Sequence, residues 1–388
     1  MILGASVYIH IPFCVSKCDY CDFFSVPCGV RAVPDEYVSA LCNELRFRLG
    51  GLARPEISTI YIGGGTPSLL SPRQLQAISG VLREFSVTEP EEWTVEVNPD
   101  DVSEDLLLSL ADVGVNRISC GVQAFEEPVL SAVRRRSSAS QVQEALSLIK
   151  KRWRGVFSAD IISALPNQTE RGFLEGLSCL LEYGPQHVSL YSLSVEEGTP
   201  LFARIDSGAL SYDFQAADAL WLKGKAFLED SGFRWYEVSN FARPGFECRH
   251  NMTYWRLADY VGTGSGGTGT RYGTPSVRFT NTCDIDAYCR FWNGEKPCEE
   301  RIPGVREELS AEDERFEFFM MGLRTADGIS LAEFERRFFS SPDSRVRTIM
   351  DEWVSDGRAE YERRASDLRF RLSDGGRLFL NDFLRGIL

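Results

Sequence analysis

Residues 6–21 read SVYIHIPFCVSKCDYC and join a strand pattern to three closely spaced cysteines. Apolar side chains alternate with others over residues 6–11, which predicts a strand that ends at Pro12. Cys14, Cys18 and Cys21 follow in a CxxxCxxC spacing. In a reducing compartment, thiols crowded into so short a loop favour a metal centre over a disulfide. The stretch therefore predicts a metal-binding loop directly after a strand.

The strand pattern recurs downstream, and helical stretches separate its copies. Strands are expected at residues 6–11, 58–62, 93–97, 117–122, 156–162 and 187–193. Helices are expected at residues 34–49, 71–84, 103–113, 138–151 and 169–182, with Ser71 as an N-cap before Pro72. The alternation predicts an α/β fold of parallel βαβ units, either a doubly wound sheet or a barrel. In both, loops after the carboxyl ends of the strands carry the functional residues.

The pattern changes after residue 193, which predicts further units. A helix is expected at residues 216–230 and a short strand at 235–239, followed by a glycine-rich stretch at 259–271. Arginine- and glutamate-rich helices at 311–323, 331–339 and 344–356 then precede a hairpin at 359–372. We expect a core at 1–230, an extension at 231–300 and a small winged-helix-like domain at 301–388. This last domain should cover the mouth of a barrel or contact a partner.

Composition and charge exclude several classes of protein. The 388 residues are 43% hydrophobic and 25% charged, as in a globular protein with a large core. The net charge of −14 makes a broad nucleic-acid surface unexpected. No apolar run reaches the ~18–20 residues of a membrane span. The first basic residue is Lys17, so no signal peptide is expected and we assign the chain to the cytoplasm.

The spacing of the three cysteines favours an iron–sulfur cluster over zinc. Three thiolates can hold three corners of a [4Fe–4S] cubane and leave one iron open to a small molecule. Structural zinc needs four closed ligands. The fourth would have to come from His10, Cys28 or a remote residue, because no second cysteine pair exists. The scattered cysteines are expected to be inert buried thiols.

Gly63-Gly64-Gly65-Thr66-Pro67 follows the second of the six strands. Glycines let a backbone approach a ligand closely, and they also serve tight strand–helix turns. No Lys-Ser/Thr follows, so a phosphate loop is not expected. The stretch alone leaves a turn and a ligand cradle as alternatives.

The segment from Tyr8 to Cys14 followed by CxxxCxxC resembles the radical S-adenosylmethionine (SAM) superfamily. The sequence motifs elsewhere in the chain are most similar to the oxygen-independent coproporphyrinogen III oxidase family, and within it to a branch of heme chaperones. The resemblance covers nearly the whole chain. It implies a partial (β/α)6 TIM-like barrel with a small C-terminal winged-helix-like domain, a [4Fe–4S] cluster at Cys14, Cys18 and Cys21, and bound SAM.

The resemblance also implies which side chains contact SAM. Gly64, Gly65 and Thr66 would cradle its methionine part. Polar residues at or near the ends of successive strands would hold the rest of SAM, and two tyrosines would lie beside the cluster. These further residues are Glu96, Gln123, Arg135, Asp160, Tyr8 and Tyr20. Taken alone, each one would be better explained as a solvated charge or a satisfied polar group in the core.

Residues 250–255 read HNMTYW and resemble the HNxxYW motif of the chaperone branch. Histidine is a common axial ligand of heme iron, and aromatic rings pack against a porphyrin face. His250 is therefore our candidate heme ligand. The alternative is a structural histidine and tryptophan packed beneath a loop.

Two departures favour the chaperone branch over the oxidases. The oxidases carry a further cysteine two residues after the third, where this chain has Phe23, and a longer segment before the cysteine loop. The resemblance then implies a chaperone that binds heme or a porphyrin and transfers heme to an acceptor hemoprotein. The alternative is a coproporphyrinogen dehydrogenase that converts propionates to vinyl groups, with flavodoxin or ferredoxin as electron donor. The third reading is a zinc-stabilised barrel, and enzymatic activity stays open.

Overall fold

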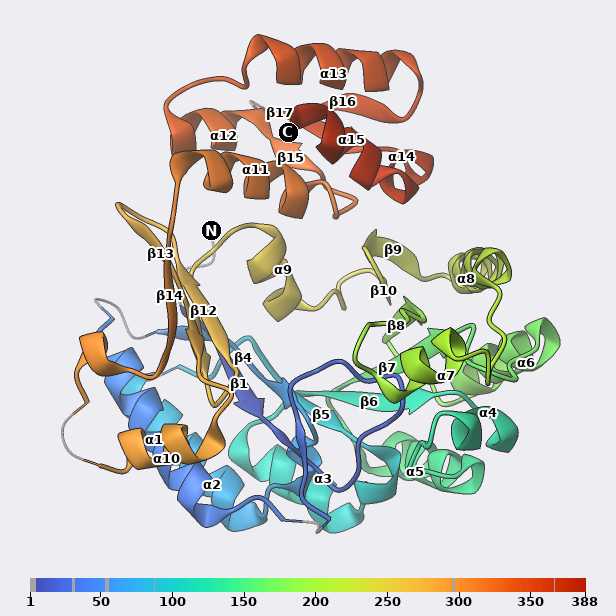
Figure 1. Ribbon diagram of the computed structural model, residues 1–388, viewed down its shortest axis with the longest axis vertical. Helices are drawn as coiled ribbons and strands as arrows, with labels where there is room; N and C mark the ends of the chain where they lie inside the picture. Colours follow the sequence, from blue (N-terminus) through green and yellow to red (C-terminus); the bar gives the residue numbers. More distant parts are fainter. Residues whose placement is uncertain (1–4, 30–31, 53–55, 87, 295–296, 366) are drawn as a thin grey trace.

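A computed structural model describes residues 5–29, 32–52, 56–86, 88–294, 297–365 and 367–388 (Figure 1). Its centre is a run of six parallel strands in the order β1-β4-β5-β6-β7-β8, so the predicted alternation is confirmed. The first eight strands are β1 (Ala5–Ile11), β2 (Phe13–Cys14), β3 (Val26–Pro27), β4 (Ile57–Gly64), β5 (Glu92–Val97), β6 (Arg117–Gln123), β7 (Val156–Ser163) and β8 (His187–Ser192).

Helices between these strands cover the outer face of the sheet (Figure 1). The expected cap is present at α2, where Ser71 and Gln74 form a reciprocal capping box. These helices are α1 (Asp35–Gly50), η1 (Pro67–Leu69), α2 (Pro72–Phe85), η2 (Pro99–Asp101), α3 (Glu104–Val113), α4 (Glu127–Ala132), α5 (Ala139–Arg152) and α6 (Glu170–Glu182). Two more, α7 (Pro200–Asp206) and α8 (Phe214–Asp230), follow β8.

The extension adds strands to both edges of the same sheet, and all of them pair antiparallel except the one beside β1, which pairs parallel with it. The strands β11 (Tyr260–Thr263), β12 (Thr268–Arg271), β13 (Ser276–Asn281) and β14 (Gly304–Leu309) continue the sheet beyond β1. At the other edge, β10 (Asn240–Ala242) and β9 (Arg234–Glu237) lie beyond β8. The glycine-rich stretch thus contains two strands that the sequence analysis did not predict. The remaining helices here are α9 (Arg249–Trp255), α10 (Ile285–Trp292) and η3 (Glu299–Arg301).

The C-terminal residues build a second, smaller core around a three-stranded sheet. Its elements are α11 (Ala311–Gly322), β15 (Ile329–Ser330), α12 (Leu331–Phe338), α13 (Ser344–Ser355), β16 (Ala359–Arg364), β17 (Asp367–Leu372), α14 (Asp374–Leu378) and α15 (Leu380–Ile387). The three predicted helices and the hairpin are present, and α14 and α15 are additional. Leu257 of the extension belongs to this second core and accepts a hydrogen bond from Arg337 Nη2 (2.8 Å).

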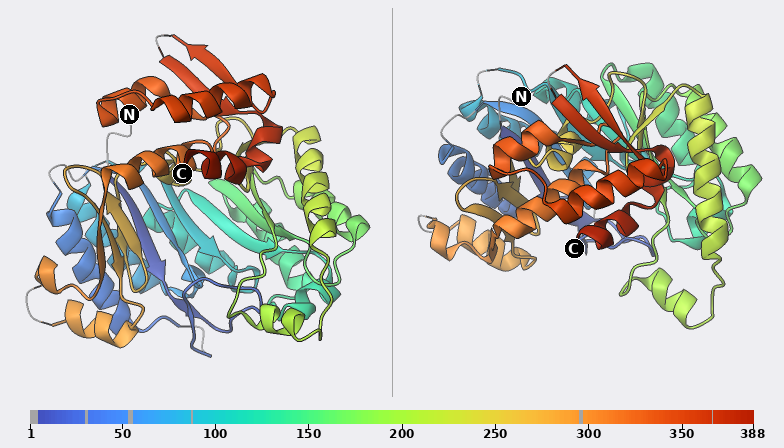
Figure 2. Two further views of the ribbon diagram at one scale, coloured as in Figure 1. Left: turned by 45° about the horizontal axis from the view of Figure 1, so that its top comes forward. Right: turned by 90° about the horizontal axis from the view of Figure 1, so that it is seen from above.

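The C-terminal domain lies at the end of the sheet where the parallel strands begin (Figure 2). Ala326 N donates to Tyr236 O (2.8 Å), and Tyr236 in turn bonds through its hydroxyl to His187 at the start of β8. The cysteine loop lies at the opposite end. The domain therefore does not cover the mouth beside the cysteines, so that half of the expectation is wrong, and contact with a partner stays a prediction. No helix of the described ranges is long and apolar enough to cross a membrane.

Candidate functional site

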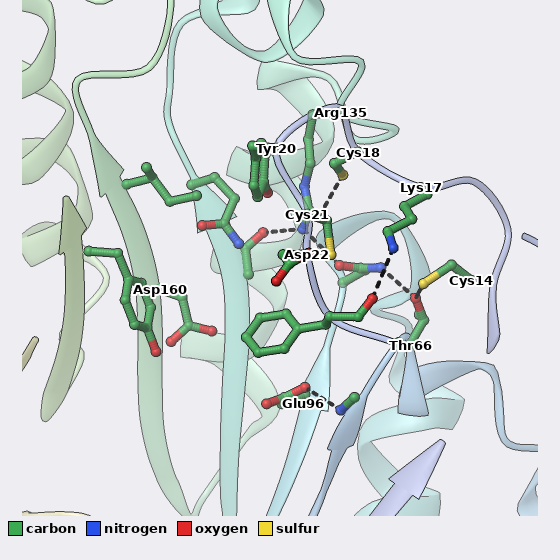
Figure 3. Close-up of a pocket in the computed structure, with 18 of the residues that line it drawn as sticks. Cys14, Lys17, Cys18, Tyr20, Cys21, Asp22, Thr66, Glu96, Arg135 and Asp160 are labelled. Atoms are coloured by element: carbon green, nitrogen blue, oxygen red, sulfur yellow. Dashed lines mark hydrogen bonds between the residues drawn. The ribbon is translucent and has the colours of Figure 1, made fainter. Parts of the chain in front are cut away.

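A cavity of about 470 Å³ opens at the carboxyl ends of the parallel strands, beneath the cysteine loop (Figure 3). The cysteines come from the loop after β1, whereas Glu96 and Asp160 reach the cavity from strands across it. Most residues singled out in the sequence line it. They are Cys14, Cys18, Tyr20, Cys21, Gly64, Gly65, Thr66, Glu96, Gln123, Arg135 and Asp160. Tyr8 and His250 are not among the lining residues.

Buried polar contacts of Asp19 hold the cysteine loop in place. Its carboxylate pairs with Arg204 (Oδ2 to Nη1, 3.1 Å), and its backbone N donates to Val133 O (3.0 Å). Leu201 N donates to Asp19 O (2.9 Å). A buried ion pair with further hydrogen bonds fixes a loop geometry. These contacts connect the cysteine loop to the C-terminal end of α4 and to α7.

Hydrogen-bond donors approach two of the three thiols. Thr66 Oγ1 donates to Cys14 Sγ (3.4 Å), and Arg135 Nη1 donates to Cys18 Sγ (3.5 Å). Burial raises the pKa of Cys21. Hydrogen bonds to the sulfur of a metal-binding cysteine orient it as a ligand. Thr66 and Arg135 can orient two of the three cysteine sulfurs in this way.

The geometry disfavours the zinc alternative. Across the described ranges, no three His, Cys, Asp or Glu side chains converge as they must around a single metal ion. His10 is engaged by Tyr8 and Phe24 O, and the Cys28 thiol donates to Cys14 O (3.1 Å). A cubane cluster needs no such convergence because each thiolate binds a different iron. The donor set fits a cluster with three cysteine ligands.

The glycines at the end of β4 pack too tightly against their neighbours to allow a side chain. Gly64 has φ +113°, and an added Cβ would lie 2.6 Å from the His10 ring. At Gly65 an added Cβ would lie 2.7 Å from Phe13 O. Both distances are below contact, so this turn requires glycine. The turn places the Thr66 hydroxyl against the cysteine loop.

Two buried polar atoms of the lining residues lack partners. Gln123 Oε1 and Arg135 Nε make no hydrogen bond within the described part of the chain. Gln123 also has φ +67°, a costly backbone conformation that follows a register shift in β6. Buried polar groups without partners are uncommon, and strained residues cluster at functional sites. Both features fit a polar ligand in the cavity.

Glu96 and Asp160 form an acidic wall. Glu96 accepts hydrogen bonds from Tyr61 Oη (2.9 Å) and Gly64 N (3.1 Å), and Asp160 accepts one from Ser119 Oγ (3.0 Å). Burial and the nearby Asp160 raise the pKa of Glu96 to about 7, and burial also raises the pKa of Asp160. A cationic ligand would restore the ionised forms. This wall suits the ammonium and sulfonium groups of SAM.

The sequence analysis missed Asn98, which connects the two sides of the cavity. Its Nδ2 donates to Thr66 Oγ1 (3.2 Å), and its Oδ1 accepts from Arg135 Nη2 (2.7 Å). Asn98 lies two residues after Glu96 in the same Glu-Val-Asn-Pro motif. Its position directly after a parallel strand could have identified it as a candidate site residue.

Tyr8 contacts the candidate site only indirectly, through a hydrogen bond to His10. His10 Nε2 donates to Phe24 O (2.9 Å), since a carbonyl only accepts. Nδ1 is then the acceptor from the Tyr8 hydroxyl (2.9 Å). The His10 ring packs beneath Gly64 and holds the residues after the cysteines. Tyr8 therefore positions His10 and does not face the cavity.

His250 is fully buried at the opposite end of the sheet, with 0% exposure. Its Nδ1 bonds to Thr59 Oγ1 (2.9 Å) and its Nε2 to Tyr254 Oη (2.7 Å). Burial lowers the pKa of His250 to about 3, so the ring is neutral. Both nitrogens are occupied, and neither is available to iron in this conformation. The expectation of a heme ligand at His250 does not fit this arrangement.

The Glu92 carboxylate anchors the helix that carries His250. It accepts hydrogen bonds from Arg249 N (3.1 Å) and His250 N (2.9 Å) and forms an ion pair with Arg117 (3.1 Å). Acceptors at a helix N-terminus satisfy backbone donors that have no partner inside the helix. The His250 ring then stacks on Tyr61, whose hydroxyl reaches Glu96. The HNxxYW helix and the acidic wall thus share one tyrosine.

Comparison with known proteins assigns the family. Residues 8–180 match the radical SAM superfamily, and residues 309–353 match the HemN C-terminal domain. The chain is 34% identical to a heme chaperone HemW of Escherichia coli K12, over 98% of this chain and 97% of that one. The chain belongs to the HemW family of the radical SAM superfamily. A Bacillus subtilis heme chaperone HemW shares 32% identity over 91% of this chain and 92% of its own.

The HemW-family chain also shares its fold with an oxidase. Coproporphyrinogen III oxidase (HemN) from Escherichia coli superimposes with a TM-score of 0.82 at 22% identity, over 99% of this chain and 90% of that one. This confirms the expected partial barrel with a C-terminal domain. Radical SAM membership of the HemW family implies a [4Fe–4S] cluster and SAM, and the cavity contains residues that fit both.

Proposed function

We propose that this protein is a heme chaperone that carries a [4Fe–4S] cluster and SAM and delivers heme to an acceptor hemoprotein. The observation that carries the proposal is the similarity along nearly the whole chain to proteins named heme chaperone HemW. The similarity spans both the barrel and the C-terminal domain, and it covers 98% of this chain and 97% of the Escherichia coli relative. We further propose a cytoplasmic location.

In this proposal Cys14, Cys18 and Cys21 hold the cluster. Gly64, Gly65 and Thr66 contact the methionine part of SAM, with Glu96 near its ammonium group. The remaining contacts come from Gln123, Arg135 and Asp160, and Tyr20 packs beside the cluster. The support is their common position around one cavity with unpartnered polar atoms.

The bound cluster would supply one-electron chemistry toward SAM, with a flavodoxin or ferredoxin as donor. The chain's own residues orient and shield the ligands. Thr66 and Arg135 donate hydrogen bonds to the sulfurs of Cys14 and Cys18 and would orient them toward the cluster. Phe23 lies at the rim in the place of a further cysteine and is 71% exposed. It leaves the cluster with three protein ligands from this loop.

Heme titration followed by a transfer assay tests the chaperone proposal. The full-length reconstituted protein should bind heme with saturable absorbance changes. It should then pass heme to an apo-hemoprotein faster than free heme reaches that acceptor. A protein that binds no heme, or retains all of it in the presence of the acceptor, would refute the proposal.

The complete cavity makes oxidase activity a second candidate function. The cavity is lined by the residues that the family resemblance assigns to cluster and SAM binding, and the fold is shared with HemN. Anaerobic incubation with coproporphyrinogen III, SAM and a reductant should yield no vinyl product if the protein is only a chaperone. Vinyl product in this assay would establish the oxidase. Mass spectrometry of 5′-deoxyadenosine with and without heme would show whether SAM is consumed.

A further inference from the structure

A second concave site lies where the barrel end meets the C-terminal domain, and we name it the domain-junction groove. Its volume is about 320 Å³, within the range of ligand pockets. The groove is lined chiefly by Trp221, Trp235 and Val238 on the barrel side, and by Arg324, Arg377 and Leu378 on the C-terminal side. It lies at the end of the sheet opposite the cysteine loop, beside α8 and β9 and under α14 (Figure 1).

Arg324 brings a half-buried positive charge to this groove. Its guanidinium packs over the Trp255 ring at 5.6 Å from the centroid. No hydrogen bond or ion pair of this side chain is recorded across the described ranges. Burial lowers the pKa of Arg324, and the nearby Glu237 carboxylate opposes this effect. Because Glu237 accepts no hydrogen bond from it in the described structure, the Arg324 guanidinium keeps its donors for an anionic ligand.

Arg377 supplies a second cation with a donor to spare. The side chain is 4% exposed, donates to Trp235 O (3.2 Å) and pairs with Asp374 Oδ1 (2.8 Å). Its Nε is buried without a partner in the described structure. A buried N–H that lacks an acceptor costs stability until a ligand or water supplies one. Two guanidiniums in the groove thus have unused hydrogen-bonding capacity.

The remaining lining is apolar and partly open. Val238 on the barrel side is 40% exposed, and Leu378 on the C-terminal side is 46% exposed. Both tryptophans beneath them have their indole N–H bonded to backbone carbonyls, so they offer only carbon to the groove. Apolar sides with two guanidiniums match a flat hydrophobic molecule that carries two carboxylates. Heme, with its two propionates, has this chemistry.

We propose that the domain-junction groove binds the heme cargo through its propionates, which pair with Arg324 and Arg377 while Val238 and Leu378 pack against the macrocycle. This inference rests on the proposed chaperone function and places its cargo site. None of the lining residues is a His, Cys, Met or Tyr, the residue types that ligate heme iron. The groove therefore holds the macrocycle without an axial ligand of its own, which leaves the iron to the acceptor.

Titration of the full-length protein with heme, iron-free protoporphyrin IX and protoporphyrin dimethyl ester tests the proposal. Heme and the iron-free diacid should bind with similar affinity, since propionates and not iron are recognised. The dimethyl ester should bind about tenfold or more weakly, because one charged hydrogen bond is worth about 1.5–3 kcal/mol. Arg324→Gln should weaken both diacids by a similar factor and leave the ester unaffected.

Leu378→Asp serves as a second variant because its side chain is exposed and tolerates a polar replacement. The added negative charge should repel the propionates and weaken heme binding. Arg256→Gln is the matched control, since Arg256 is 57% exposed, pairs with Asp327 and does not line the groove. The control should bind as the wild type does, and thermal unfolding should show that all three variants are folded.

The outcomes separate the cargo site from the chaperone function. If the wild type binds and transfers heme but Arg324→Gln and Leu378→Asp bind it equally well, the groove assignment is overturned and the chaperone stands. Binding of heme without binding of protoporphyrin IX overturns it too, because iron ligation would then dominate. If the wild type binds neither compound, the chaperone function itself fails.

Discussion

Where the parallel strands end, side chains surround an open cavity, and Gln123 Oε1 and Arg135 Nε have no partner in the described structure. Where the same strands begin, His250 bonds at both nitrogens, and Glu92 secures the N-terminus of the HNxxYW helix. Trp255 Nε1 and Arg117 Nη2 have no partner there in the described structure, but they do not line the cavity beside the cysteines. The open end therefore offers its unpartnered atoms to a ligand, whereas His250 at the closed end already has partners for both of its nitrogens.

This difference separates roles that residue types alone do not distinguish. A buried polar group with every bond made rigidifies a core, whereas one with bonds unmade favours a ligand. Cysteine and glutamate at the open end are then expected to govern cofactor binding. Histidine at the closed end is expected to govern stability. Substitutions at the two ends should therefore change different properties of the protein.

The largest effect is expected from Cys18→Ser at the open end. Anaerobic reconstitution of the wild type should give about four irons and four sulfides per chain. The variant should lose nearly all of them because one corner of the cluster loses its thiolate. Cys28→Ser is the matched control, since its hydroxyl can still donate to Cys14 O. Iron analysis and the visible spectrum measure the result, and an iron-free control would contradict the cysteine assignment.

At the closed end, His250→Ala should destabilise the fold by about 2–4 kcal/mol. The change leaves a cavity and removes the partners of Thr59 and Tyr254. Urea unfolding measures the free energy, and heme titration of the folded variant should give an unchanged Kd. Loss of heme binding with unchanged stability would instead return His250 to the role of ligand.

SAM affinity should depend on the ionisation of Glu96. Its pKa of about 7 leaves the carboxyl mostly protonated at pH 6 and mostly ionised at pH 8. Because the anion attracts the SAM ammonium, the Kd should fall by about tenfold between these pH values. Glu96→Gln should remove this dependence and bind weakly at both. A pH-independent Kd in the wild type would show that Glu96 does not face a cation.

The smallest effect is expected away from both ends. Ser71→Ala removes the capping box of α2 and should cost about 1 kcal/mol of unfolding free energy. Iron content, SAM affinity and heme affinity should stay at wild-type values. A change in any of these would show that α2 transmits strain to the cavity.

Local signals explain which parts the sequence could predict. Ser71 before Pro72 marks a helix start through contacts within four residues, and each parallel strand carries several apolar residues interspersed with polar ones. The end of β5 locates Glu96, because parallel strands finish at one edge. Asp160 lies inside β7 and reaches the same cavity. The cavity residues were therefore accessible to sequence reasoning, together with the family resemblance.

The features that the sequence did not predict depend on contacts between residues far apart in the chain. The environment of His250 depends on Thr59 and Glu92, which are far from it in sequence. The strands β11 and β12 contain glycines and are four residues long, so neither shows a strand period, and they form by pairing beside β1. The placement of the C-terminal domain follows from side chains such as Arg377, whose partner Trp235 lies in another unit.

Leu257 has a consequence for how the chain can be divided. It follows the HNxxYW helix, has φ +48°, and packs inside the apolar centre of the C-terminal domain. A C-terminal fragment cut near residue 300 would lack this side chain, and part of its apolar core would be exposed to water. Transfer of the C-terminal domain to another barrel therefore requires Leu257, or an apolar residue in its place, to be supplied as well.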